Sequence, residues 1–388
     1  MKTQVAIIGA GPAGSLLSLL LKRRGVDCVV IERQSKDYVL GRVRAGILEW
    51  TSVEILRAAG LGQRLDAEGH VHNSVKLAWR AEETLSIDFE RLAGKPMMAY
   101  GQTKVQQDLY EAVEAEGVAT IFDTSDVAIH DVTSESPWVT FAANGESVRL
   151  DCDYVAGCDG QHGISRTAIP RSITTEYERA YPFGWLGILS ETPPLPHLLY
   201  ANHARGFALC SERNPMLSRY YVQCPLDDSV DDWSDDRFWS ELLTRLPKSE
   251  ADAIVTGPSI EKSIAPLRSY VLEPMQYGRL FLAGDAAHIV PPTGAKGLNL
   301  AISDVHYLSE AFAATYTGSP DKLDAYSTTA LARVWGSVRF SWWLTVLLHR
   351  FPDQSPFEQR AREEDLNYLA GSEAAQTSFA EQYVGLDL

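Results

Sequence analysis

Gly9-Ala10-Gly11-Pro12-Ala13-Gly14 lies near the start of this 388-residue chain and decides its fold. The run before it, Val5-Ala6-Ile7-Ile8, is apolar and β-branched, which predicts a buried parallel strand. The residues from Ser15 to Arg24 are rich in leucine and end in basic side chains, which predicts a helix. A glycine loop between a strand and a helix is typical of the turn that binds the phosphates of a dinucleotide.

The three glycines and a later acid fit such a loop. Gly9 permits the tight turn, Gly11 lets a pyrophosphate approach the backbone, and Gly14 lets the helix pack closely on the strand. A second predicted strand, Cys28 to Ile31, is followed by Glu32, eighteen positions beyond Gly14, where an acid binds the ribose hydroxyls. A glycine-rich turn in an unrelated α/β domain is the alternative interpretation.

A second loop, Gly284-Asp285-Ala286-Ala287-His288, follows the predicted strand Leu280 to Ala283. Because this loop comes about 270 residues after the first, the pair predicts one extended dinucleotide held from both ends. That arrangement indicates FAD rather than a transiently bound nicotinamide. Glu32 suits a ribose with a free 2′-hydroxyl.

The composition argues against several classes of protein. A formal net charge of −16 disfavours nucleic acid or an anionic membrane as a partner. The apolar stretch from Phe340 to Leu348 is too short to span a bilayer. Met1-Lys2-Thr3 leads into the first predicted strand, so we expect no signal peptide and a cytoplasmic protein. No CxxC pair is present, so we expect no metal site and five buried, reduced thiols: Cys28, Cys152, Cys158, Cys210 and Cys224.

The chain is predicted to form two interleaved domains and a C-terminal region. Residues 1–180 and 267–350 form a discontinuous FAD-binding domain, and residues 181–266 form a substrate domain with a contribution from about 73–96. Residues 351–388 form a C-terminal helical region. The fold class is therefore α/β, with a Rossmann-like FAD-binding domain, an interleaved mostly-β substrate domain and C-terminal helices.

The substrate segment contains a predicted hairpin. Two strand-like runs, Phe207 to Arg213 and Ser218 to Gln223, flank the turn Asn214-Pro215-Met216. Strand alternation places Leu209, Ser211 and Arg213 on one face, and it places Arg219 and Tyr221 together. An arginine beside hydroxyl groups suits a carboxylate held by two hydrogen bonds. An exposed hairpin with solvated arginines is an equally good interpretation of these residues alone.

The two glycine motifs, together with the turn Cys158-Asp159-Gly160 and Arg166, resemble the three sequence marks of the class A flavoprotein aromatic hydroxylases. The resemblance runs almost end to end and is closest to members that act on 4-hydroxybenzoate. The segments that carry it are 33–34, 37–42, 181–187, 200–203, 262–268, 283–299 and 383–386. It implies a glutathione-reductase-like FAD-binding domain.

The resemblance implies roles for residues of the substrate segment. Arg213 binds the carboxylate of a benzoate, with help from Ser211 and Tyr221. Trp185 and Leu209 form the walls against the aromatic ring.

The resemblance also implies a proton relay. Tyr200 hydrogen-bonds the substrate hydroxyl, Tyr383 extends that bond, and His72 lies at the solvent end. The carbonyl oxygen of Pro292 is a further partner for the phenol. Removing the phenol proton makes the ring a stronger nucleophile, which is general base catalysis at a distance.

On the cofactor side, the resemblance places Glu32 on the adenosine ribose. It places Lys296 as a positive charge near the flavin, and the backbone of residues 297–299 at a helix N-terminus against the ring. The full set of implied FAD-binding residues is Gly9, Gly11, Gly14, Glu32, Arg42, Val43, Arg44, Ala45, Gly46, Ile47, Gln102, Asp285, Lys296, Gly297, Leu298 and Asn299.

No second strand–glycine–helix unit is present, so a nicotinamide reductant is expected to dock transiently rather than in a Rossmann site of its own. The resemblance assigns that docking to Arg33, Tyr38, His162 and Arg268. Arg33 and Lys36 favour a 2′-phosphate, so we expect NADPH, with NADH possible. Gln161 departs from the aromatic residue that is typical of the family beside His162, which affects the docking surface.

The implied reaction is the hydroxylation of 4-hydroxybenzoate at C3 to 3,4-dihydroxybenzoate, with NADPH and O2 and through a flavin C4a-hydroperoxide. A homodimer is implied as well. Two alternatives remain: a hydroxylase of a related phenolic or amino benzoate, and a flavin-binding protein without hydroxylase activity.

Overall fold

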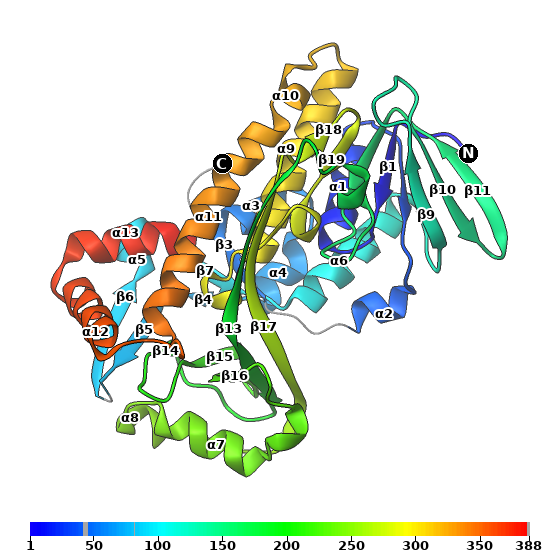
Figure 1. The fold of residues 1–388 in the computed structure, drawn as a ribbon. Helices are drawn as coiled ribbons and strands as arrows, with labels where there is room; N and C mark the ends of the chain where they lie inside the picture. Colours follow the sequence, from blue (N-terminus) through cyan, green and yellow to red (C-terminus); the bar gives the residue numbers. More distant parts are fainter. Residues whose placement is uncertain (42–45, 81, 386–388) are drawn as a thin grey trace.

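The computed structural model describes residues 1–41, 46–80 and 82–385. A six-stranded sheet forms the part that contains the glycine loops, and two three-stranded sheets lie nearby (Figure 1). In sheet order the six strands are β18 (Gln276–Tyr277), β19 (Leu280–Leu282), β12 (Tyr154–Gly157), β1 (Val5–Ile8), β2 (Cys28–Ile31) and β8 (Ala119–Ile121). The three-stranded sheets are β11 (Glu146–Asp151), β10 (Trp138–Ala143), β9 (Ser125–His130) and β3 (Ile47–Glu49), β7 (Met97–Ala99), β4 (His70–His72).

Strands β1 and β2 match the two apolar runs predicted from the sequence, and all of their residues are buried. They pair in parallel with each other, and β1 also pairs in parallel with β12, which explains the unbroken apolar runs. Helix α1 (Pro12–Arg23) follows β1 directly and packs against α6 (Gln102–Ala115) and α9 (Gly297–Tyr316). The predicted strand–loop–helix unit is therefore present.

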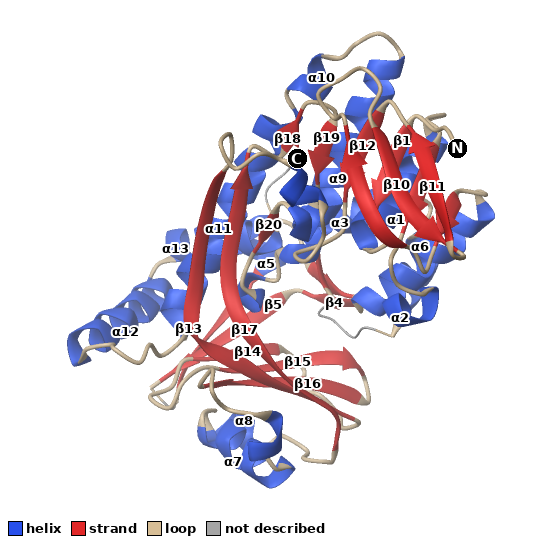
Figure 2. Ribbon diagram, turned by 45° about the vertical axis from the view of Figure 1, so that its right-hand side comes forward, coloured by secondary structure: helices blue, strands red, loops and turns tan. Residues whose placement is uncertain are grey.

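The second large sheet has eight strands (Figure 2). In order they are β20 (His288–Ile289), β17 (Ser259–Glu273), β13 (Thr175–Ser190), β16 (Leu217–Cys224), β15 (Ala208–Asn214), β14 (Leu198–Ala201), β5 (Ser74–Trp79) and β6 (Glu83–Asp88). Strands β15 and β16 form the predicted hairpin, with Asn214 paired to Leu217 across the turn. Strands β5 and β6 come from the segment 73–96 that was expected to join this region.

Two strands of this sheet, β13 and β17, are unusually long, and their far ends lie near the six-stranded sheet (Figures 1 and 2). Their register shifts between Ala180 and Gly184, opposite Arg268 and Pro266. The domain boundaries at 180/181 and 266/267 fall at this irregularity and stay a prediction, since both strands continue across it.

Helices cover both faces of the eight-stranded sheet. Helix α7 (Asp235–Thr244) packs Phe238 and Leu242 against the outer face. Helix α11 (Tyr326–Leu348) leads to α12 (Pro356–Gly371) and α13 (Glu373–Val384), which pack with aromatic residues of the inner face. The remaining helices are α2 (Lys36–Leu40), α3 (Trp50–Ala58), α4 (Gly62–Glu68), α5 (Phe89–Ala93), α8 (Lys248–Ala251) and α10 (Asp321–Asp324).

The five cysteine thiols are buried and unpaired, as the sequence predicted. Over the described residues, no helix is both long and apolar enough to cross a membrane.

Candidate active site

The glycine loop has no room for side chains at two of its three glycines. Gly9 has a φ of 102°, and a Cβ atom there would lie 2.4 Å from the Cys158 carbonyl oxygen. A Cβ on Gly14 would lie 1.9 Å from the Gly9 carbonyl oxygen, so helix and strand meet at van der Waals distance. A Cβ on Gly11 would meet nothing within 4 Å, because this residue borders an open cleft. These are the conditions that a bound pyrophosphate needs.

Side-chain hydrogen bonds fix the shape of this loop. The Ala10 carbonyl oxygen accepts bonds from Ser15 Oγ at 2.9 Å, Tyr110 Oη at 2.9 Å and Gln106 Nε2 at 3.2 Å. The Ala10 N–H donates to Glu32 Oε2 at 2.7 Å. Glu32 is buried just after β2 and also lines the cleft. The same carboxylate therefore holds the glycine loop and is in position to contact a bound ligand.

The second loop is held by a buried ion pair that the sequence did not predict. Asp304, on α9, accepts the Gly284 N–H at 2.9 Å and contacts His288 Nε2 at 2.6 Å. Burial disfavours charge on the His288 imidazole, but the Asp304 carboxylate outweighs it and raises the pKa of His288. Arg166 donates to the Asp285 carbonyl oxygen at 2.5 Å, which ties the loop to the turn after Cys158.

Both loops border one cleft of about 610 Å³. The predicted cofactor residues that line it are Gly9, Gly11, Glu32, Ile47, Gln102, Asp285, Lys296, Gly297 and Leu298. Gly14, Gly46 and Asn299 do not line it, and Arg42, Val43, Arg44 and Ala45 lie outside the described residues. A bare glycine loop at one end, an acid at the ribose position and a helix N-terminus at the other end fit a dinucleotide such as FAD.

Behind the cleft, Lys296 belongs to a buried charge cluster. Its Nζ contacts Glu49 Oε1 at 2.6 Å and the Tyr383 carbonyl oxygen at 2.7 Å. Arg333 contacts the other Glu49 oxygen at 2.7 Å. Burial lowers the pKa of Lys296, and Glu49 opposes that shift. Lys296 and Arg333 therefore contact the two oxygens of one buried carboxylate.

Asn299 supports this region from behind. Its Oδ1 accepts the Glu49 N–H at 2.9 Å, and its Nδ2 donates to the carbonyl oxygens of Ile47 and Ala295 at 3.0 and 2.7 Å. The side chain therefore ties β3 to the loop that precedes α9.

The register of the eight-stranded sheet brings the predicted substrate residues to one face. Tyr221 pairs with Leu209, and Leu209 pairs with Tyr200. Ser211 lies two positions further along the same strand, opposite Arg219. Gly187 lies opposite Tyr221, and the tyrosine ring packs over the glycine. A Cβ at Gly187 would lie 2.5 Å from Tyr221 Cε1, so no larger residue fits there without moving the ring.

The two arginines of the hairpin differ in their partners. Arg219 is buried and contacts Glu261 Oε1 at 2.9 Å, and its guanidinium lies 5.0 Å from the centre of the Tyr221 ring. Arg213 is half-buried at a register shift in β15, and burial lowers its pKa while the Tyr221 hydroxyl opposes the shift. Among the described residues no carboxylate lies within ion-pair distance of Arg213.

Tyr200 and Tyr383 are directly hydrogen-bonded. Their oxygens lie 2.8 Å apart, and Tyr200 Oη also donates to the Thr293 carbonyl oxygen at 3.1 Å. Burial raises the pKa of Tyr200 to about 12 and also raises the pKa of Tyr383. Pro292 lines the cleft beside Thr293, and its carbonyl oxygen accepts the Ala295 N–H at 3.0 Å.

His72 is not hydrogen-bonded to this pair. It is buried at the end of β4, and its Nε2 has no partner among the described residues. Burial lowers the pKa of His72, which the nearby Glu212 opposes. The structure therefore brings the two tyrosines together and leaves His72 unconnected.

The predicted nicotinamide residues lie on two neighbouring depressions. Arg33, Tyr38 and His162 line the large cleft. Arg268 lines a groove of about 350 Å³ that also contains His162. Arg268 donates to Gln161 Oε1 at 3.1 Å, so the residue that departs from the family pattern contacts a predicted docking residue.

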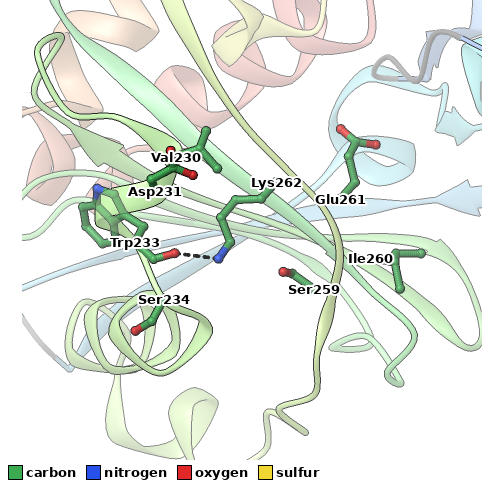
Figure 3. A pocket seen from close by; sticks show the side chains of 8 residues that line it. All are labelled: Val230, Asp231, Trp233, Ser234, Ser259, Ile260, Glu261 and Lys262. Carbon is green, nitrogen blue, oxygen red and sulfur yellow. Dashed lines mark hydrogen bonds between the residues drawn. The ribbon is translucent and has the colours of Figure 1, made fainter.

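A separate surface depression of about 480 Å³ lies at the outer end of β17, near α7 (Figure 3). Its Lys262 donates to the Trp233 carbonyl oxygen at 2.6 Å (Figure 3). The same amine contacts Asp235 at 2.7 Å. Lys262 is thus already paired, and none of the predicted site residues lines this depression. We therefore do not consider it a candidate active site.

The aromatic wall includes a residue that the sequence did not single out. Trp185 stacks on Phe207 with 4.8 Å between ring centres, and its Nε1 donates to His349 Nε2 at 2.6 Å. His349 follows an apolar helix, where a histidine usually marks no more than the helix end, so no sequence signal distinguished it.

Comparisons with known proteins agree with this geometry. The FAD binding domain family matches residues 2–341. The p-hydroxybenzoate hydroxylase of Acinetobacter baylyi (strain ATCC 33305 / BD413 / ADP1) is 51% identical over 100% of this chain and 96% of its own length. A 3-(3-hydroxy-phenyl)propionate/3-hydroxycinnamic acid hydroxylase of Mycolicibacterium gilvum (strain PYR-GCK) is 27% identical over 83% of this chain and 56% of its own length.

A solved structure extends the likeness in fold. The p-nitrophenol 4-monooxygenase of Pseudomonas putida DLL-E4 has a TM-score of 0.83 at 19% identity, with 100% of both chains covered. At that identity the likeness shows the fold alone. The family match over most of the chain and the relative that is half identical throughout establish the rest: the chain belongs to the FAD-binding flavoprotein hydroxylases, in the p-hydroxybenzoate hydroxylase family, and FAD is its cofactor.

Proposed function

We propose that the protein hydroxylates 4-hydroxybenzoate at C3 to 3,4-dihydroxybenzoate, with NADPH and O2 as co-substrates. One observation carries the choice of substrate: Arg213 is half-buried on the substrate face, without a carboxylate partner among the described residues. A half-buried guanidinium without a counter-ion suits an anionic ligand, and its planar fork matches a carboxylate.

The aromatic ring of the substrate would lie along the same face. Arg213 binds the carboxylate, and Tyr221 offers a hydroxyl group beside it. Ser211 Oγ, which donates to the Arg219 carbonyl oxygen at 3.0 Å, would turn to the carboxylate when it binds. Trp185 and Leu209 wall the ring. The pairing Tyr221–Leu209–Tyr200 across three strands supports this order, because it places a hydroxyl group at each end of an apolar stretch.

Tyr200 and Tyr383 would move the phenol proton. A pKa of about 12 means that Tyr200 is protonated at neutral pH and is no permanent base. It can accept the substrate proton only while it passes its own to Tyr383, for which its hydroxyl group must turn from the Thr293 carbonyl oxygen toward Tyr383, 2.8 Å away. His72 is proposed as the solvent end of the relay, and the Pro292 carbonyl oxygen as a further partner of the phenol.

The cofactor end completes the proposal. FAD bound in the cleft would supply the redox chemistry that turns O2 into an electrophilic oxygen, with NADPH as the source of electrons. The glycine loop would bind the pyrophosphate and Glu32 the adenosine ribose. The N-terminus of α9, with residues 297–299, and the Lys296 cluster would stabilise negative charge on the reduced ring.

NADPH would dock along the outer cleft through Arg33, Tyr38 and His162, with Arg268 in the adjoining groove. We also propose a homodimer, as the family resemblance implies, and a location in the cytoplasm. Sedimentation equilibrium of the FAD-loaded protein measures the oligomeric state.

The deciding experiment follows aerobic NADPH consumption by the FAD-loaded protein, with and without 4-hydroxybenzoate, and identifies products by chromatography. Stimulation with a matching amount of 3,4-dihydroxybenzoate supports the proposal. Stimulation without hydroxylated product contradicts the role of the tyrosine pair. Absence of stimulation contradicts the choice of substrate, and a related phenolic or amino benzoate is then tested in the same assay.

A further inference from the structure

His349 lies at the end of α11, completely buried within the aromatic wall of the substrate face. Its ring is parallel to Phe183 with 4.8 Å between ring centres, and it stacks on Phe207 at 4.3 Å. The Trp185 ring lies nearly parallel as well, at 5.7 Å. A polar ring in such surroundings needs a partner for each nitrogen.

Both nitrogens have one, and together the partners permit a single protonation state. The Trp185 indole N–H can only donate, so His349 Nε2, 2.6 Å away, must accept. The Thr345 carbonyl oxygen can only accept, so His349 Nδ1, 2.9 Å away, must carry the hydrogen. Burial lowers the pKa of His349 to about 3, so the ring is neutral at physiological pH.

The same histidine is tied to the tyrosine pair through threonines. Thr345 Oγ1 donates to the Ser341 carbonyl oxygen at 2.7 Å and lies 2.9 Å from Thr293 Oγ1, with which it shares a hydrogen bond. The Thr293 carbonyl oxygen accepts from Tyr200 Oη at 3.1 Å. One connected path therefore joins the indole of Trp185 to the hydroxyl of Tyr200.

The end of α11 is also fixed to the sheet beside this path. Arg362 Nη1 donates to the His349 carbonyl oxygen at 3.0 Å. Asn202 Nδ2 donates to the carbonyl oxygens of Leu347 and Leu348 at 3.1 and 3.2 Å. The imidazole is thus held in place from its backbone, and the hydrogen bond to Trp185 transmits that position to the indole.

We propose that His349 is a positioning residue, whose neutral imidazole holds the Trp185 indole as the wall of the aromatic-acid pocket and sets it in register with Tyr200. The proposal rests on the proposed function, since it concerns the pocket for 4-hydroxybenzoate. His349 itself exchanges no proton with the substrate.

Two substitutions of His349 separate the hydrogen bond from the packing. His349→Phe keeps a stacked ring and removes the acceptor, and His349→Gln places a carbonyl oxygen near the position of Nε2. With calorimetric titration of 4-hydroxybenzoate into the FAD-loaded protein, we expect about tenfold weaker binding for His349→Phe, the scale of one buried unsatisfied N–H. We expect His349→Gln to restore most of the affinity.

A double-mutant cycle with Trp185→Phe tests the route. If the indole bond carries the effect, His349→Phe weakens binding no further in the Trp185→Phe background. If the two losses multiply instead, the bond is not the route and the proposal is wrong. The pH profile of hydroxylation in His349→Gln is expected to match the wild type, and a shifted profile contradicts a positioning role.

A matched control and a ligand-free measurement complete the test. His130, on β9, also stacks on a tryptophan, with 3.8 Å to the Trp138 ring, and it lies in another sheet (Figure 1). His130→Phe is expected to leave the affinity unchanged, and an equal loss there overturns the proposal.

Nitrogen-15 NMR of the protein at pH 7 is expected to find His349 neutral with its hydrogen on Nδ1. Any other state overturns the proposal, whether or not 4-hydroxybenzoate binds. If the NMR result holds and the wild type does not bind 4-hydroxybenzoate, the proposed function fails instead.

Discussion

The phenol oxygens of Tyr200 and Tyr383 lie 2.8 Å apart, although 183 positions separate the two residues in the chain. Tyr200 belongs to strand β14 of the eight-stranded sheet, and Tyr383 belongs to the C-terminal helix α13. The Tyr383 ring is stacked between Phe89 and Phe379, with ring centres 5.0 and 5.6 Å away. Ring packing and the hydrogen bond to Tyr200 together set the position of the Tyr383 hydroxyl group.

Tyr200→Phe is expected to leave the affinity for 4-hydroxybenzoate largely intact and to lower the rate of hydroxylation about a hundredfold, the scale of one general acid–base group. Product yield per NADPH measures this. Tyr220→Phe is the matched control, since Tyr220 is equally buried but lies on the opposite face of the sheet. Unchanged product yield in Tyr200→Phe would remove the residue from the relay.

Arg213→Ala is expected to weaken binding of 4-hydroxybenzoate by about 3–5 kcal/mol, because it leaves a desolvated carboxylate without its partner. Calorimetric titration measures the affinity. Arg237→Ala, in the outer helix α7, serves as the control for the loss of a cation. A change of only a few fold in Arg213→Ala means that the carboxylate binds elsewhere.

Gly14→Ala is expected to weaken FAD retention about tenfold, because its Cβ would lie 1.9 Å from the Gly9 carbonyl oxygen and would displace the loop. Flavin absorbance after dialysis gives the bound fraction. Gly336→Ala is the control, since no atom lies within 4 Å of a Cβ there and alanine favours helix α11. Full retention in Gly14→Ala contradicts the placement of the pyrophosphate at this loop.

Gly187→Ala is expected to push the Tyr221 ring away from the sheet, since the new Cβ would lie 2.5 Å from Tyr221 Cε1. Overpacking of this kind costs about 1–3 kcal/mol, part of which should appear as a raised KM for 4-hydroxybenzoate. Gly371→Ala, with open space around its Cβ, is expected to show no change. An unaltered KM in Gly187→Ala would place Tyr221 outside the binding site.

The buried His349 gives the fold a pH dependence of known sign. Burial lowers its folded-state pKa to about 3, whereas an unfolded histidine titrates near pH 6.5, so below about pH 6.5 the unfolded chain gains a proton that the folded chain does not. The free energy of unfolding therefore decreases as the pH is lowered below about 6.5, by about 1.4 kcal/mol per pH unit. Urea unfolding at pH 7 and pH 5 should show the wild type losing about 2 kcal/mol more than His349→Gln. Equal losses would mean that the imidazole is already protonated in the fold.

Much of the fold could be predicted from local sequence patterns. Strands β1 and β2 coincide with the two apolar runs because a strand buried on both faces has no polar alternation to blur its ends. The turn at Asn214–Met216 could be predicted because proline and asparagine favour turn geometry. The hairpin then determines which residues share a face.

Contacts between distant parts of the chain could not be predicted this way. Lys296 and Glu49 are 247 positions apart, and no spacing rule joins them. Asp304 lies in the middle of α9, where an acid usually faces solvent, and only the packed structure reveals its bond to Gly284. His349 is a further case, because its role depends on three aromatic rings from other elements.

The paired strands β13 and β17 give a final consequence. Their backbone pairing runs on both sides of the register shift between Ala180 and Gly184, so the same two strands belong to both ends of the fold. Binding energy gained at one end then protects the other from opening. A small aromatic acid on the far sheet would slow hydrogen exchange around the glycine loops, at a distance and without touching them.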